Sequence, residues 1–155
     1  MSRVRVVFLG EDPRDPMQAA AADYLARAGR RFDAALVALK PERRAKGGDD
    51  AKVRAIEAES LLRASDGCAR VALDPRGTEL DSLAFAKELE ALLQRGKPVA
   101  FLVGGASGLH DDVREAADKT WSLSRLTFAH LLAVLVVAEQ IYRAAEIARG
   151  GPYHK

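Results

Sequence analysis

"PVAFLVGG", residues 98–105, is the most strand-like segment of the chain, an apolar run that ends in two glycines. A continuous apolar run of this length is typical of a strand buried on both faces of a parallel sheet. A glycine-rich turn directly after such a strand is where many α/β proteins bind a cofactor. The segment therefore predicts an α/β fold with a ligand site near Gly104 and Gly105.

The rest of the chain alternates between strand-like and helix-like segments. Strands are predicted at residues 4–10, 32–39 and 69–74. Helices are predicted at residues 17–29, 51–65, 82–96 and 131–150, with 75–81 as a turn. Asp15 and Asp81 stand where N-caps of the first and third helices are expected. This alternation predicts a mostly parallel sheet flanked by helices, with Asp74 and Gly104 at the carboxyl ends of strands.

Length and composition indicate one ordinary globular domain that spans residues 1–155. The single cysteine excludes an intrachain disulfide, and no apolar stretch is long enough for a signal peptide or a membrane span. We therefore expect a cytoplasmic protein without membrane contact. The net charge of +2 does not identify a nucleic-acid binder, and the basic run "KPERRAK" (40–46) either touches phosphate or is a solvated loop.

Several common chemistries are excluded by the motifs. The turn "GGASG" (104–108) matches neither a dinucleotide fingerprint nor a phosphate-binding P-loop, and Ser107 is one residue out of place for a nucleophile elbow. The three histidines, His110, His130 and His154, lack metal-ligand spacing, so no metal is expected. The glycines then either let a ligand approach bare backbone or only make a tight turn.

The order of several short motifs is distinctive. They are "LDPRG" (73–77), "GGASGL" (104–109), "WSLSRLT" (121–127), "EQIYRA" (139–144) and "PYHK" (152–155). Together with the length of the chain, they resemble the RlmH-type ribosomal RNA methyltransferases of the SPOUT class, and the resemblance covers essentially the whole chain. That family methylates N3 of a pseudouridine in large-subunit (23S) ribosomal RNA.

The resemblance implies a C-terminal trefoil knot, a homodimer, S-adenosylmethionine as cofactor and the assembled ribosome as partner. Apolar side chains and close backbone suit an adenine-binding pocket. The positions that match the cofactor-binding residues of the family are Leu73, Gly104, Leu123, Ser124, Arg125, Leu126, Thr127 and Phe128.

Three residues at the C-terminal end match the catalytic positions that the resemblance implies. Arg143 would hold RNA phosphate or stabilise an imide anion, Tyr153 would stack on or hydrogen-bond the base, and His154 would accept a proton, because the pKa of histidine is ordinarily near neutral. The alternative is structural: Glu139 and Arg143 pair on one helix face, and the terminal Tyr-His-Lys is a frayed tail.

Two positions depart from the family pattern. Ala129 stands where a proline is usual, and Val134 stands where an arginine is usual. These changes leave open the hypothesis of a non-catalytic RNA-binding relative. A further hypothesis, from outside the family, is a small α/β module whose glycine turn binds another adenine compound. His130 is expected to order the turn into the last helix, and Trp121 is expected to belong to the core rather than to a base-stacking surface.

Overall fold

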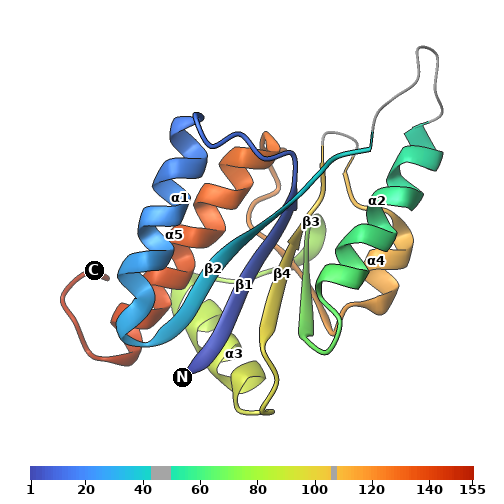
Figure 1. Ribbon diagram of the computed structural model, residues 1–155. Helices are drawn as coiled ribbons and strands as arrows, with labels where there is room; N and C mark the ends of the chain where they lie inside the picture. Colours follow the sequence, from blue (N-terminus) through green and yellow to red (C-terminus); the bar gives the residue numbers. More distant parts are fainter. Residues whose placement is uncertain (43–49, 106–107) are drawn as a thin grey trace.

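Five parallel strands form the central sheet of the protein, whose computed structural model describes residues 1–42, 50–105 and 108–155. The order across the sheet is β2-β1-β4-β3-β5, and every described strand pair is parallel (Figure 1). The strands are β1 (Ser2–Leu9), β2 (Phe32–Leu39), β3 (Ala69–Glu79), β4 (Val99–Val103) and β5 (Lys119–Ser122). The predicted α/β fold is confirmed. Most of the basic run at 40–46, and Ser107, lie outside the described residues.

Helices cover both faces of this sheet. They are α1 (Pro16–Arg27), α2 (Asp50–Ala64), α3 (Ser82–Leu93), α4 (Asp111–Ala116) and α5 (His130–Ala148), with a short 3₁₀ turn at Ala28–Arg30. The helices α1, α3 and α5 pack on one face, and α2 and α4 on the other (Figure 1). The result is a three-layer α/β/α arrangement.

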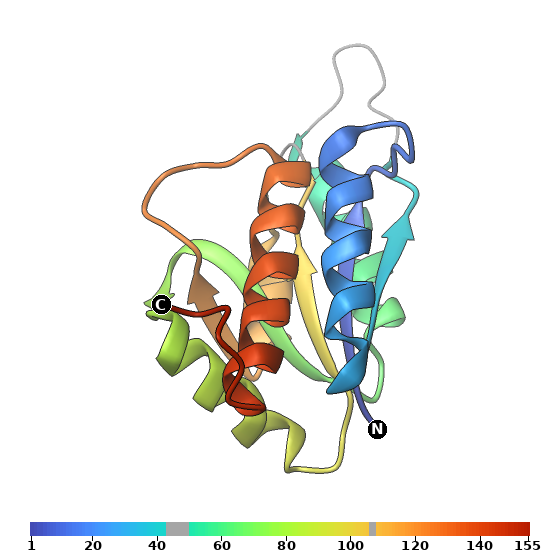
Figure 2. The same ribbon diagram turned by 90° about the vertical axis from the view of Figure 1, so that its left-hand side faces the viewer.

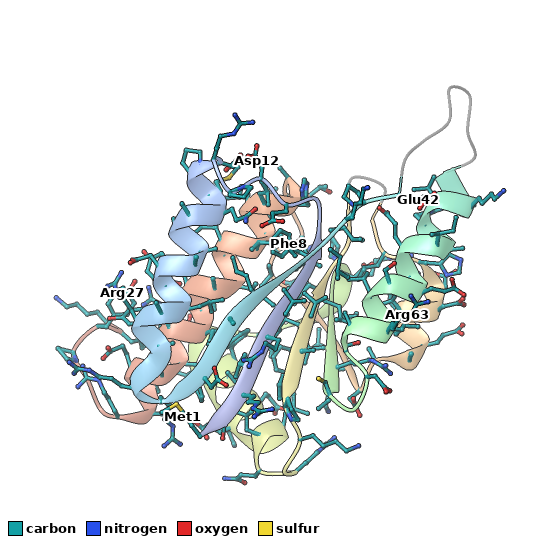
Figure 3. All side chains as sticks on the ribbon, viewed as in Figure 1. Met1, Phe8, Asp12, Arg27, Glu42 and Arg63 are labelled. Atoms are coloured by element: carbon teal, nitrogen blue, oxygen red, sulfur yellow. The ribbon has the colours of Figure 1, made fainter. Side chains whose placement is uncertain are left out.

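The two faces of β1 show why the sheet is covered on both sides. Val4, Val6 and Phe8 belong to the core under α1, α3 and α5, whereas Val7 and Leu9 belong to the core under α2 and α4. Successive side chains of a strand point to opposite faces, so an uninterrupted apolar run fills both cores. Phe8, labelled in Figure 3, is completely buried.

Side-chain caps start α1 and α3 at the predicted residues. The carboxylate of Asp15 accepts a hydrogen bond of 2.8 Å from the Met17 amide, and that of Asp81 accepts one of 2.8 Å from the Ala84 amide. Each cap satisfies an amide that has no partner inside its helix.

The last helix, α5, lies beside α1 on the sheet and also packs against α3 (Figure 2). This position explains its apolar sequence, because a helix in contact with a sheet and two helices buries more than one side. Trp121 is confirmed as a core residue: it is 4% exposed and packs against Phe85 and Phe101, with ring centroids 5.4 and 5.9 Å away.

Three elements differ from the sequence prediction. The predicted turn at 75–81 is wrong, because β3 continues to Glu79 and pairs there with β5. The register shifts between Leu73 and Thr78, and this irregularity accommodates Pro75 and Gly77 within the strand. The short β5 and α4 were not predicted, since four and six residues carry too little periodicity to stand out. The trefoil knot stays a prediction.

Candidate functional site

A pocket of about 420 Å³ opens at the carboxyl end of β4 and beside the middle of β3. Its walls are Leu73–Pro75, the glycine turn after β4, the loop between β5 and α5, and the first turn of α5 as far as Ala133. Figure 2 shows the loop between β5 and α5 as a long extended connection. The volume and the mostly apolar lining are those of a small-molecule site, in the place where parallel sheets bind ligands.

Segments far apart in the sequence meet in this pocket. Seven of the eight predicted cofactor-binding residues line it: Leu73, Gly104, Leu123, Ser124, Leu126, Thr127 and Phe128. The eighth, Arg125, does not line the cavity; its side chain is 87% exposed and lies 4.0 Å from the carboxylate of Glu79. Within the loop, the Ser124 hydroxyl accepts a hydrogen bond of 3.0 Å from the Leu126 amide.

Gly104 is needed for the packing of the pocket loop itself. A Cβ atom on Gly104 would stand 2.7 Å from the carbonyl carbon of Gly108 and 2.9 Å from the Leu109 nitrogen. A Cβ on Gly105 would meet the carboxylate of Glu57 at 3.3 Å. The close approach at Gly104 is therefore between two backbone segments, which agrees with the tight-turn interpretation of these glycines.

A buried carboxylate connects β3 to this glycine turn. Asp74 lines the pocket, is 8% exposed, and lies 3.0 Å from the Arg114 guanidinium, which also donates to the Leu109 carbonyl at 3.2 Å. Arg76 donates to Asp74 through both its backbone amide, at 2.9 Å, and its side chain, at 3.1 Å. Arg114 thus ties the backbone directly after the glycine turn to the middle of β3.

The charge of Asp74 is stabilised by these contacts. Burial is the largest single effect and raises the pKa of Asp74, but the hydrogen bonds from Arg76 and the positive charges of Arg76 and Arg114 together outweigh it. The net result is a pKa below the ordinary aspartate value. Asp74 is therefore an anion at neutral pH, placed in the wall of the pocket.

The start of α5 closes the pocket on a further side. His130, the first residue of α5, has its Nε2 atom 3.4 Å from the Gly10 carbonyl oxygen, so it connects the helix start to the end of β1. Ala129 has φ −56° and ψ 145°, a conformation that proline also adopts. Val134 is completely buried, so a charged side chain in this position would face the core of this chain.

A second cluster of polar residues lies near the other end of α5. The carboxylate of Glu139 accepts hydrogen bonds from Arg143 at 2.6 Å and from the Tyr153 hydroxyl at 2.9 Å. Nδ1 of His154 lies 3.1 Å from an Arg143 nitrogen. The structure therefore brings together the three predicted catalytic residues: Glu139 binds Arg143 and Tyr153, and His154 contacts Arg143.

The C-terminal residues pack against the protein and do not form a frayed tail. The ring of Tyr153 meets that of Tyr142 edge-on at 4.7 Å, and the Arg143 guanidinium lies 4.7 Å from the Tyr153 ring. Arg27, labelled on α1 in Figure 3, lies 4.5 Å from the Tyr142 ring. Desolvation, followed by the hydrogen bond to Glu139 and its charge, raises the pKa of Tyr153 to about 12.

The pocket and the C-terminal cluster are separate within one chain. Arg143 follows Ala133, the last pocket residue of α5, by ten positions, which corresponds to about 15 Å along a helix. One chain therefore presents a pocket at one end of α5 and a polar cluster toward the other.

Sequence reasoning did not find Arg76 or Arg114. Arg114 is 40 residues from Asp74 and lies on the unpredicted helix α4, so only the folded chain shows the pair. The "LDPRG" motif was the available signal for Arg76.

In residues 1–42, 50–105 and 108–155, no group of three or more His, Cys, Asp or Glu side chains is arranged for a metal ion. No helix in the same residues is long and apolar enough to cross a membrane.

Comparison with known proteins shows similarity over the whole chain. The family model described as "Predicted SPOUT methyltransferase" matches residues 2–154. The protein named ribosomal RNA large subunit methyltransferase H from Thiobacillus denitrificans is 41% identical over 99% of both chains, and the one from Sorangium cellulosum is 45% identical over 97% of this chain and 98% of its own length.

Solved structures share the fold at lower sequence identity. A probable methyltransferase from Bordetella pertussis covers 93% of this chain and 95% of its own, with a TM-score of 0.61 and 18% identity. A tRNA (m1G37) methyltransferase from Aquifex aeolicus covers 92% of this chain and 70% of its own, with a TM-score of 0.57 and 12% identity.

Proposed function

This chain belongs to the SPOUT methyltransferases, and on that premise we propose that it transfers a methyl group from S-adenosylmethionine to N3 of a pseudouridine in large-subunit (23S) ribosomal RNA. The observation that carries the proposal is the pocket of about 420 Å³, in which segments around residues 73, 104 and 123–128 converge. The relatives named ribosomal RNA large subunit methyltransferase H support the substrate.

The pocket residues suit an adenosine-containing cofactor. Leu73 and Leu123 would supply apolar surface for the faces of the adenine ring, while backbone groups of Gly104 and of residues 123, 124 and 126–128 would supply donors and acceptors for its edge. S-adenosylmethionine provides an electrophilic methyl group on a sulfonium sulfur and is converted to S-adenosylhomocysteine. The main task of the protein is then to hold N3 of the base in line with that methyl group and to exclude water.

We propose a homodimer, because the pocket and the C-terminal cluster are far apart within one chain and apolar side chains on α5 and the pocket loop are left uncovered. Leu132 and Val136, one turn apart on α5, are half-buried and belong to neither core cluster, and Leu126 on the pocket loop is 70% exposed. Burial of these apolar side chains against a second copy is favourable. A second copy also supplies a second C-terminal cluster. In a dimer, the cluster of one copy would lie close to the pocket of the other, although the two sites are far apart within one chain.

The reaction requires that the imide N3 lose its proton while the N–CH₃ bond forms and the S–CH₃ bond breaks. Arg143 stays charged, because its hydrogen bond to Glu139 raises its pKa further above the ordinary value. We assign to it the binding of an RNA phosphate or of the developing imide anion. Tyr153 would stack on the base or donate to it.

The role of His154 as proton acceptor requires a rearrangement. A guanidinium group only donates hydrogen bonds, so the contact with Arg143 uses the lone pair on Nδ1 of His154 and leaves the proton on Nε2. Binding of RNA phosphate by Arg143 would release that lone pair for the N3 proton. Phosphate binding and proton removal would thus be linked through one contact.

The test is to incubate the purified protein with tritiated S-adenosylmethionine and ribosomes from a strain that lacks this methylation. Assembled ribosomes and free large subunits from the cytoplasm of that strain are compared as substrates. Labelled RNA is then mapped by nuclease digestion and mass spectrometry. Label on N3 of a large-subunit pseudouridine supports the proposal and shows that Ala129 and Val134 are tolerated. Cofactor binding without label would instead support a non-catalytic relative.

A further inference from the structure

A second cavity, of about 630 Å³, lies between the end of β3 and the edge strand β5. We call this cavity, lined by residues 76–78, Arg114 and residues 118–121, the β3–β5 groove. It shares a wall with the cofactor pocket, because Asp74 and Pro75 line the pocket while the next two residues, Arg76 and Gly77, line the groove. The two cavities are therefore neighbours along β3.

Gly77 shapes the floor of this groove. A Cβ atom at Gly77 would stand 2.6 Å from the Thr120 carbonyl oxygen and 2.8 Å from the Trp121 carbonyl carbon, so a larger residue would push β3 away from β5. Thr78 and Thr120 line the groove on the two strands. Neither hydroxyl has a hydrogen-bond partner within the described part of the chain.

Three cations and one acid line the groove: Arg76, Arg114, Lys119 and Asp118. Arg114 is neutralised by ion pairs with Asp74 and Asp111. Asp118 is already engaged, since it accepts a hydrogen bond of 2.8 Å from the Arg70 amide and lies 3.9 Å from the Arg95 guanidinium.

Lys119 is the cation that remains free. It is half-buried on β5, and no hydrogen bond or ion pair joins it to any residue within 1–42, 50–105 or 108–155. Arg76 binds Asp74 but keeps 71% of its side chain exposed, so part of its guanidinium can reach a ligand. The groove therefore offers two available cations and two hydroxyl donors around one cavity.

We propose that the β3–β5 groove binds a backbone phosphate of the RNA next to the methylated nucleotide, with Lys119 and Arg76 as the contacting cations. A phosphodiester carries one negative charge, and its oxygen atoms accept hydrogen bonds from ammonium, guanidinium and hydroxyl groups. The inference rests on the proposed function and extends it to the substrate surface. It places the flanking RNA along the β5 edge of the sheet.

The experiment compares Lys119→Gln with Lys97→Gln. Lys97 is exposed just before β4, lines neither cavity, and has no ion pair in the described residues, so it provides the same change of charge elsewhere on the surface. Methylation of ribosomes is measured as KM and kcat at several salt concentrations, and S-adenosylhomocysteine binding is measured by calorimetry.

We expect Lys119→Gln to raise KM for the ribosomal substrate about five-fold at low salt, as for one lost exposed ion pair. The slope of log KM against log salt should fall by about 0.7–0.9, as for one lost phosphate contact. The kcat value, the S-adenosylhomocysteine affinity and the melting temperature should stay unchanged. Lys119→Arg should restore KM, and Lys97→Gln should behave as the original protein.

Equal effects of Lys119→Gln and Lys97→Gln, or no effect of either, would overturn the groove as an RNA site. A fall in melting temperature that Lys119→Arg does not rescue would also overturn it, because the lysine would then be structural. If the unmodified protein methylates no ribosomal RNA at all, the proposed function itself fails, and the inference fails with it.

Discussion

Gly104→Ala tests the central feature of the pocket, the contact between the residue after β4 and the returning backbone of the same loop. The added Cβ would stand 2.7 Å from the Gly108 carbonyl carbon, whereas ordinary contacts begin at 3.4 Å. The loop must therefore move by about 0.7 Å or remain compressed. Overpacking of this kind costs about 1–3 kcal/mol.

This cost in free energy should lower either the melting temperature or the cofactor affinity, depending on whether the loop moves. If the loop stays in place, the folded state is strained, and the melting temperature of a chain of this size should fall by about 2–12 °C. If the loop moves, the pocket loses its shape, and S-adenosylhomocysteine should bind about 5- to 150-fold more weakly. Gly104→Val should give a larger loss of cofactor affinity in a protein that still folds.

The assays are thermal unfolding and calorimetric titration of the same preparations. Gly29→Ala is the matched control, because a Cβ at Gly29 meets no atom within 4 Å. Its melting temperature and cofactor affinity should equal those of the original protein. If Gly104→Ala also matches the original protein in both measurements, the packing argument for this turn is refuted.

Four further outcomes are expected. Glu139→Gln should lower the pKa of Tyr153 from about 12 toward 10.0, as measured by ultraviolet absorbance. Folding raises this pKa in the original protein, so the stability that Tyr153 contributes is complete below pH 10.0 and is lost as the pH rises toward 12. Asp74→Asn should lower the free energy of unfolding in urea at neutral pH, and the difference from the original protein should shrink below pH 3.8. The reason is that the lowered pKa of Asp74 contributes stability only above that range. A difference that does not change with pH would contradict this. Leu132→Glu should convert a dimer to a monomer in analytical ultracentrifugation. Deletion of residues 153–155 should reduce turnover far more than cofactor affinity, and an active truncated enzyme would refute the assigned roles.

Local sequence signals predicted the parts of the fold that depend on local physics. The apolar run in β4 and the caps Asp15 and Asp81 determine strand and helix starts through interactions between near neighbours. The turn predicted at 75–81 failed because the extended conformation of β3 depends on pairing with β5, more than 40 residues later. Such a pairing leaves little trace in a window of ten residues.

The chain alone therefore determined the alternation of strands and helices, the motifs of the family, and the residues that these motifs single out for the cofactor. Only the folded molecule decided which of these residues meet. It placed Arg114 against Asp74, joined Tyr153 and His154 to Glu139 and Arg143, and brought Lys119 and Arg76 to the lining of one cavity. The physical reason is that backbone propensity and apolar periodicity act within a few residues, whereas ion pairs and pockets form between segments that only the packing of the sheet and helices brings within a few ångströms.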